Sequence, residues 1–156
     1  MKENNPITER NIKSIHQLVL KDIDNENAGR YRRENVTIKD ATHIPPDYLK
    51  VPELMEKLIL NYKNWNDFHP IIQAALLHGE LVKIHPFIDG NGRTSRLLMN
   101  LDLMNHGYNP VIIKKEDRLE YYEALDKAHT TGDYTDFVKL IKKLEIVMLR
   151  KYLELL

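Results

Sequence analysis

The run PIIQAALLHGELVKI, residues 70–84, is the strongest structural signal in this chain. It is apolar almost all round, and an α-helix of that kind is normally buried at the centre of a bundle. Pro70 suits the first turn of a helix, where the N–H that proline lacks would be unpaired in any case. We therefore expect a central helix here, with the other helices packed around it.

A second helix is predicted directly downstream, over residues 92–105, after a break at residues 85–90. Helical spacing places four apolar side chains of this helix on its inward face, and they are Leu97, Leu98, Leu101 and Met104. Gly107 fits the position just past a helix end, and Pro110 suits the stop that follows it. The sequence therefore predicts two central helices joined by a short connection.

Apolar residues at helical spacing predict further helices on both sides of this pair, over residues 8–22, 51–62, 116–129 and 134–153. Thr8 is the expected N-cap of the first, and its apolar stripe is Ile12, Ile15, Leu18 and Val19. Residues 30–46 differ, because they combine a β-branched stretch with prolines that cannot lie inside a helix. We interpret them as a flap, and the fold class as an all-α helical bundle with a small β-hairpin flap.

Length, net charge and cysteine content limit the kinds of protein that this chain can be. A chain of 156 residues can form one hydrophobic core and is too short for two comfortable ones. The formal net charge is zero, so no overall field favours nucleic acid or an anionic membrane. The absence of cysteine excludes disulfides, cysteine-ligated zinc and a cysteine nucleophile. We expect one cytoplasmic domain over residues 1–156, without nucleic acid or membrane partners.

The connection between the central helices and the turns that follow it read HPFIDGNGRTSR, residues 85–96. The Gly-Asn-Gly sequence at 90–92 precedes a helix, whose unpaired N–H groups and dipole favour an anion. Arg93 and Arg96 are three residues apart, hence on one helix face, and each can bind phosphate oxygens in a bidentate way. Cations at a helix N-terminus oppose the dipole, and a bound anion would remove this conflict.

Two more residues of this segment add chemistry. Asp89 offers a hard oxygen ligand where a phosphate-bound Mg²⁺ would need one. His85 lies at the other side of the loop, where a neutral imidazole can accept a proton from a hydroxyl. A Gly-Asn-Gly turn is also often only a turn, and first-turn arginines are often simply solvated. The residues alone thus support a phosphate site and a plain turn about equally.

Residues 85–96 also match the signature of the Fic family, H-P-F-x-D/E-G-N-G-R-x-x-R, at every fixed position. The resemblance extends over nearly the whole chain. Residues 28–32 (AGRYR) resemble the family's G-x-Y/F-R sequence before the flap, and residues 36–46 resemble the flap itself. Residues 84–100 are especially similar to the Fic domains of animal endoplasmic-reticulum AMPylases.

The resemblance implies a role for each motif residue. His85 would be the base that deprotonates the acceptor hydroxyl, and Asp89 would hold Mg²⁺ on the α- and β-phosphates of ATP. Phe87 would fill the core and fix the loop. The residues expected to bind the phosphates are Gly90, Asn91 and Gly92 as the anion hole, with Arg93 and Arg96 on the β- and γ-phosphates.

Two further contact regions are implied outside the motif. The flap would hold a target segment by strand addition, a sequence-tolerant way to present a side chain. Its expected docking residues are Thr37, Ile38, Thr42 and His43. Tyr121 and Tyr122 match a pair that lines the adenine pocket in similar proteins, although half-buried helix aromatics are nearly as good an interpretation. His129 stands where those relatives have an adenine-contacting asparagine, which leaves base selectivity open.

The resemblance implies a protein adenylyltransferase (AMPylator) that moves AMP from ATP, its co-substrate, to a Ser, Thr or Tyr hydroxyl of target proteins, with Mg²⁺ as cofactor. Two alternatives stay open: transfer of a different phosphate-containing group, and a non-catalytic nucleotide-binding or interaction module. The glycines at 90 and 92 favour nucleotidyl transfer, and an intact His85 and Asp89 disfavour the non-catalytic module.

Many Fic proteins are restrained by a helix bearing [S/T]-x-x-x-E-[G/N], whose glutamate pairs with the second motif arginine. No such sequence occurs in the 156 residues. We therefore expect an uninhibited chain, with Arg96 free and self-modification readily seen. An upstream helix or an inhibitory partner that supplies the glutamate, and a homodimer in which a second subunit supplies a carboxylate, are left open.

Overall fold

The computed structural model describes residues 5–156, and every regular element among them is helical. The α-helices are α1 (Glu9–Leu20), α2 (Val51–Asn64), α3 (Pro70–Ile84), α4 (Asn91–Asn105), α5 (Arg118–Thr131) and α6 (Thr135–Glu154). Short 3₁₀ helices cover Tyr48–Lys50, Trp65–Asp67 and Lys115–Asp117. The all-α prediction is therefore confirmed.

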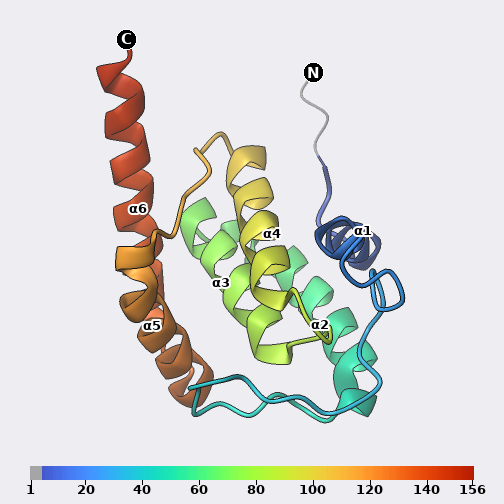
Figure 1. Cartoon of the computed structure of the whole chain (residues 1–156). Helices are drawn as coiled ribbons and strands as arrows, with labels where there is room; N and C mark the ends of the chain where they lie inside the picture. The colour runs from blue at the N-terminus through green and yellow to red at the C-terminus, as the bar shows by residue number, and fades with distance from the viewer. Residues whose placement is uncertain (1–4) are drawn as a thin grey trace.

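Helix α3 is the centre of the bundle and contacts α4, α2, α6 and α5 (Figure 1). It contributes to two separate buried clusters. Leu77 and Leu81 belong to the cluster shared with α1 and α2, whereas Ala74 and Val82 belong to the cluster shared with α5 and α6. Because α3 is buried on both sides, its sequence is apolar almost all round.

The helix ends follow the capping rules used above. The Thr8 hydroxyl accepts the main-chain N–H of Asn11 at 3.1 Å and caps α1. Pro70 occupies the first turn of α3. Gly107 lies just past α4 with φ 82°, a conformation that glycine adopts without strain.

The inward faces of α1 and α4 differ from the prediction. Leu97 and Met104 are 52% and 46% exposed, and Leu18 is 73% exposed. The buried side of α4 instead includes Leu98, Met99 and Leu103, because α4 lies between α3 and α1. In α1 the buried residues are Ile12, His16 and Leu20. A histidine thus occupies an inward position that apolar periodicity alone does not identify.

The β-hairpin predicted for residues 30–46 is wrong, since residues 5–156 contain no strand. The segment does run along the base of the bundle to α5 and back (Figure 1), reversing where the Ala41 N–H donates to the Ile38 carbonyl. The N–H groups of Thr42 and His43 donate to Oδ1 of Asp126 in α5, at 2.9 and 3.1 Å. Donors engaged by a side chain cannot also form a strand ladder.

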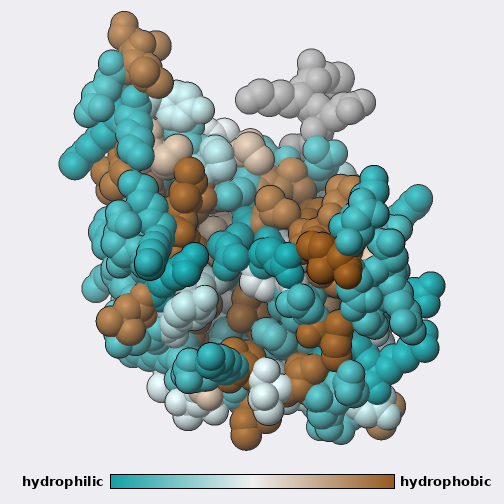
Figure 2. Space-filling view, in the orientation of Figure 1, coloured by the Kyte–Doolittle hydropathy of each residue, from teal (hydrophilic) through white to brown (hydrophobic). Residues whose placement is uncertain are grey.

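The last turns of α6 extend beyond the rest of the bundle (Figure 1) and carry exposed apolar side chains, including Leu149, Tyr152 and Leu153. In Figure 2 brown atoms mark this end of the helix at the upper left, above a surface that is mostly hydrophilic. Within the described part of the chain, no helix combines the length and the apolar character needed to cross a membrane.

Candidate active site

The connection between α3 and α4 is held in a tight, partly strained path. His85 is the C-cap of α3 and lies in the left-handed region (φ 52°, ψ 58°), and Gly90 is the N-cap of α4 with φ 78°. A left-handed non-glycine residue costs free energy and is often found at functional sites. A Cβ on Gly90 would lie 3.2 Å from the Val19 side chain in α1, so glycine suits this position in both conformation and space.

Asn91 fixes this loop from inside. Its Oδ1 accepts the N–H of Phe87 at 2.9 Å, and its Nδ2 donates to the Phe87 carbonyl at 2.8 Å. Phe87 is fully buried and Asn91 is buried. The Asn91 amide is therefore used up within the loop, and only the main chain of Asn91 is left to meet an anion at the start of α4.

Helix α1 holds the loop from outside through His16, a residue that the sequence analysis did not identify. Its Nδ1 accepts the N–H of Gly29 at 2.9 Å, and its Nε2–H donates to the Asp89 carbonyl at 2.8 Å. The ring stacks on Phe87, with centroids 3.6 Å apart and an interplanar angle of 5°. Burial lowers the pKa of His16, so a neutral ring makes both bonds.

Arg32 ties the loop to the flap, and the resemblance covered this residue without assigning it a role. It is buried, and its Nε donates to the His85 carbonyl at 2.7 Å. Its Nη1 donates to the Glu34 carbonyl at 3.0 Å and its Nη2 to the Pro46 carbonyl at 2.6 Å. Its main-chain N–H donates to the Pro86 carbonyl at 2.9 Å. One guanidinium thus joins both ends of the flap to the loop.

His85 has a neutral ring with one nitrogen free. Its Nδ1–H donates to the Val82 carbonyl at 3.2 Å, which leaves the lone pair on Nε2 available. Burial lowers the pKa of His85 below its ordinary 6.5, and the neighbouring Arg32 and His43 lower it further. The ring is therefore neutral at pH 7 and can accept a proton.

The charged residues of the motif lie beside the start of α4. Asp89 accepts the Gly90 N–H on Oδ1 at 2.7 Å, and its Oδ2 lies 3.3 Å from Nη2 of Arg93. This ion pair is exposed and contributes about 0–1 kcal/mol, so a ligand can displace it at little cost. Within residues 5–156, Arg96 has no carboxylate within 4.0 Å.

Gly92 leaves open space beside these charges. α4 begins at Asn91 without a side-chain cap, so its first main-chain N–H groups have no partner within the helix. A Cβ at Gly92 would meet only the Arg96 guanidinium, 3.3 Å away, among its near neighbours. The donor groups, the guanidinium and the missing side chain together form a cradle suited to an anion.

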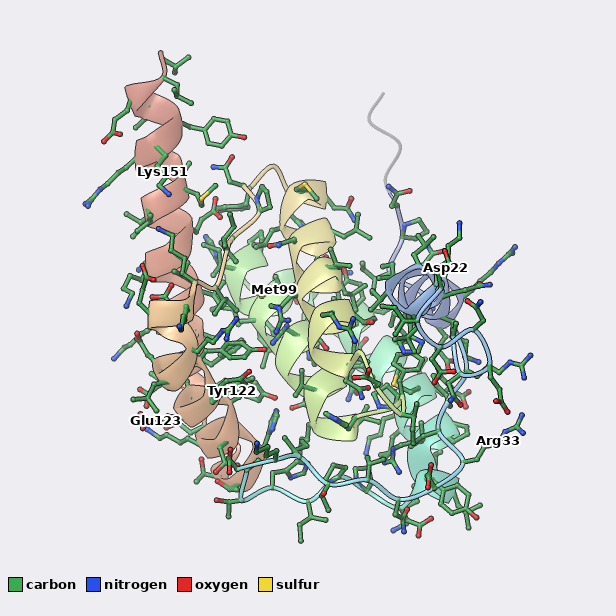
Figure 3. The ribbon with its side chains drawn as sticks, in the orientation of Figure 1. Asp22, Arg33, Met99, Tyr122, Glu123 and Lys151 are labelled. Atoms are coloured by element: carbon green, nitrogen blue, oxygen red, sulfur yellow. The ribbon has the colours of Figure 1, made fainter. Side chains whose placement is uncertain are left out.

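The two tyrosines of α5 point in different directions. Tyr121 is buried and shares a 2.6 Å hydrogen bond between its hydroxyl and Nε2 of His78. Tyr122 is 60% exposed and lies on the side of α5 that faces α4, whereas Glu123 points away from the bundle (Figure 3). His129 is buried, and its Nε2–H donates to the Gly79 carbonyl at 2.8 Å.

The flap places its predicted docking residues unequally. Thr37 and Thr42 are exposed, whereas Ile38 and His43 are half-buried. His43 donates from Nε2 to the Lys83 carbonyl at 2.9 Å, and its ring lies edge-on to the ring of His129 at 5.1 Å. The flap end after the turn is therefore attached to α3 and α5, while Thr37 and Ile38 lie before the turn.

Comparisons with known proteins identify the family of this chain. A model of the Fic/DOC family matches residues 6–103. The chain is 46% identical over 137 residues to the protein named "Protein adenylyltransferase Fic" from Drosophila mojavensis. This match covers 86% of this chain and 27% of that protein. The chain thus spans about a quarter of the length of this curated relative.

Solved structures share the fold. A fragment of Fic-1 from C. elegans superposes with a TM-score of 0.85 at 38% identity, over 99% of this chain and 45% of that one. BepC from Bartonella tribocorum, solved with bound AMPPNP, has a TM-score of 0.68 at 18% identity, over 87% of this chain and 73% of that one. At that identity the BepC comparison supports the fold alone.

Proposed function

The chain belongs to the Fic/DOC family, and we propose that it is a protein adenylyltransferase that moves AMP from ATP to a Ser, Thr or Tyr hydroxyl of a target protein. The observation that carries this proposal is the neutral His85 ring, with Nδ1 bonded to Val82 and Nε2 open, beside the N-terminus of α4. Transfer of a nucleotide to a hydroxyl needs a base and preorganised donors for phosphate charge, which His85 and the start of α4 would supply.

In the proposed reaction the acceptor oxygen attacks the α-phosphorus, its proton passes to Nε2 of His85, and the bond to the leaving pyrophosphate breaks. Charge on the β- and γ-phosphates would be stabilised by the main-chain N–H groups of Asn91 and Gly92, by that of Gly90 once it leaves Oδ1 of Asp89, and by Arg93 and Arg96. The open cradle at Gly92 fits such a group. The exposed carboxylate of Asp89 would hold Mg²⁺, which neutralises phosphate charge when bound.

Adenine and the target take neighbouring positions in this proposal. The exposed Tyr122 ring is the better placed of the two tyrosines to contact a base, with Tyr121 supporting it from the core. Target docking on the flap uses Thr37 and Ile38 for main-chain contacts, because the N–H groups of Thr42 and His43 are engaged by a carboxylate of α5.

The proposed unit is one Fic domain over residues 1–156, with the flap at 30–46 and the core motif at 85–96, located in the cytoplasm. Both buried clusters share α3, which supports a single folding unit. A chain without cysteine suits a reducing compartment. Limited proteolysis and cell fractionation test these two statements.

Inhibition is proposed to act through Arg96, which has no carboxylate within 4.0 Å among residues 5–156. A glutamate from an upstream helix, a partner protein or the second subunit of a homodimer would pair with this guanidinium and displace the γ-phosphate. Adding a peptide with the [S/T]-x-x-x-E-[G/N] sequence should then reduce self-labelling. Unchanged self-labelling at saturating peptide would contradict this mode of control.

The central test uses ATP labelled at different phosphates. With Mg²⁺ and a cell lysate, α-³²P-ATP should label proteins above the level seen with His85→Ala, and γ-³²P-ATP should add no label above that level, because pyrophosphate leaves. His85→Ala should remove the label, and Asp89→Ala should weaken the Mg²⁺ dependence of nucleotide binding. Label from the γ-phosphate would favour transfer of a different phosphate-containing group, and binding without label would favour a non-catalytic module.

A further inference from the structure

A cavity of about 350 Å³ lies between the end of the flap, α2 and α3, and of its lining residues only His43 is among the expected docking residues. Its lining includes Ile44 and Pro46 of the flap, Leu58 of α2 and Ile84 of α3. Ile84 directly precedes His85 in the chain, and the flap residue His43, which also lines the cavity, is close enough to His85 to lower the pKa of that ring.

The walls of this cavity are fixed before any ligand binds. On the flap side, the Pro46 carbonyl accepts a hydrogen bond from Arg32 at 2.6 Å, and His43 donates to the Lys83 carbonyl at 2.9 Å. On the helix side, Leu58 and Ile84 are buried in the core. A site formed in advance loses little free energy to ordering when it binds a ligand.

The charge around the cavity is positive. Lys57 and Lys83 line it, and within residues 5–156 neither ammonium has a carboxylate within 4.0 Å. One acidic residue, Glu80, is among the described lining residues, and its Oε1 accepts the hydroxyl of Tyr134 at 2.7 Å. Two ammonium groups and an apolar floor suit a side chain with a short apolar stem and a negative end.

We propose that this cavity binds an acidic side chain, Glu or Asp, of the target segment, close to the residue that receives AMP. The inference rests on the proposed function, because the segment must present its hydroxyl to His85. An extended chain advances about 3.3 Å per residue. A side chain one or two residues from the acceptor therefore reaches a cavity that begins beside His85.

The test compares two peptide arrays that differ only in the residues flanking a Ser, Thr or Tyr acceptor, which are Glu in one and Lys in the other. Each is incubated with the protein, Mg²⁺ and α-³²P-ATP. The protein should label the Glu array about five- to tenfold more strongly, the size expected for charge contacts to one exposed and one half-buried lysine. The double variant Lys57→Glu/Lys83→Glu should reverse the preference.

Lys63→Glu is the control for the change at Lys57, because it makes one Lys→Glu substitution on the same helix at a residue outside the cavity lining, and it should keep the Glu preference. Melting temperatures establish whether each variant folds. If the double variant Lys57→Glu/Lys83→Glu does not fold, Lys57→Gln/Lys83→Gln replaces it and should abolish the preference.

Three results would overturn the acidic subsite. They are equal labelling of both arrays, a preference that the double variant does not reverse, and label on lysate proteins but on no peptide. An increased KM for ATP in the double variant would show nucleotide binding in the cavity and would also overturn it. Absence of label on peptides and lysate proteins alike would contradict the proposed adenylyl transfer instead.

Discussion

The loop at residues 85–96 and the flap at residues 30–46 meet at Arg32, yet they are stabilised in different ways. The loop closes largely through its own sequence, since Asn91 bonds the main chain of Phe87 four residues earlier. The flap has no ladder of its own, and its far end depends on Asp126 in α5. Local closure makes the loop recognisable in sequence, whereas the flap takes its shape from distant elements.

The largest effect is expected at the base. His85→Ala should reduce transfer by about 10²- to 10⁴-fold, the usual contribution of a general base. Binding of Mg²⁺–ATP should stay nearly unchanged, because the phosphate contacts come from α4 and not from this ring. Transfer rates and calorimetric ATP affinity measure the two quantities separately. Near-normal transfer by the variant would remove His85 from this role.

Arg32→Ala tests whether loop and flap depend on one side chain. The change removes the donors of the His85, Glu34 and Pro46 carbonyls, which are partly buried. Loss of these charge-assisted hydrogen bonds should lower the free energy of unfolding by about 3 kcal/mol. Urea unfolding measures this loss.

The neighbouring Arg33→Ala is the control, because Arg33 is exposed and points away from the bundle (Figure 3). Its variant should differ from the unchanged chain by less than about 0.5 kcal/mol. Equal losses for the two arginines would mean that Arg32 does not couple loop and flap.

Acid should weaken the attachment between α3 and α5 beneath the flap. Burial holds the pKa of His129 at about 4, against 6.5 for an ordinary histidine. Below pH 6.5 the unfolded chain binds a proton at this histidine and the folded chain does not. The free energy of unfolding therefore decreases as the pH is lowered from 6.5 toward 4. At pH 5.5 the loss from this residue should be about 1.4 kcal/mol relative to high pH.

His129→Gln should remove that part of the pH dependence, because a glutamine can still donate to the Gly79 carbonyl and does not titrate. Urea unfolding at pH 7.5 and 5.5 checks the difference. Residual acid sensitivity is expected from His78, whose burial holds its pKa at about 3. An unchanged difference between the two pH values in the variant would reject this assignment.

His16→Phe separates ring packing from hydrogen bonding at the loop. Phenylalanine retains an aromatic ring against Phe87, and it removes the bonds to the Asp89 carbonyl and the Gly29 N–H. We expect transfer to fall about tenfold, since a loop displaced by a fraction of an ångström misplaces its donors. The Mg²⁺ concentration for half-maximal activity should rise as well, because Asp89 loses its fixed position.

Leu18→Ala, at an exposed residue of the same helix, is the control and should leave both quantities unchanged. A purely structural His16 would lower the melting temperature of the Phe variant and leave the Mg²⁺ dependence as it was. The two readouts therefore distinguish a positioning residue from a packing residue.

How much of the structure can be predicted from the sequence depends on how far apart in the chain the interacting residues are. The central helices follow from local periodicity and caps, so Pro70 and Gly107 lie where expected. The motif is likewise local. By contrast, the bonds of His16 to Asp89 and of Arg32 to His85 join residues 73 and 53 positions apart. No local pattern marks such pairs, since each partner looks like an ordinary polar residue until the helices pack.

The smallest effect is expected where the flap is attached to α5. Asp126→Ala removes the acceptor for the N–H groups of Thr42 and His43, but water can replace it at this half-exposed site. We expect amide exchange at these two residues to quicken severalfold, and KM for a target peptide to rise about threefold as the flap loses preorganisation. Asp126→Asn keeps an acceptor oxygen and should restore both values. If KM and exchange stay constant in the alanine variant, the flap is held by Arg32 and His43 without Asp126, and the contrast with the self-closed loop becomes smaller.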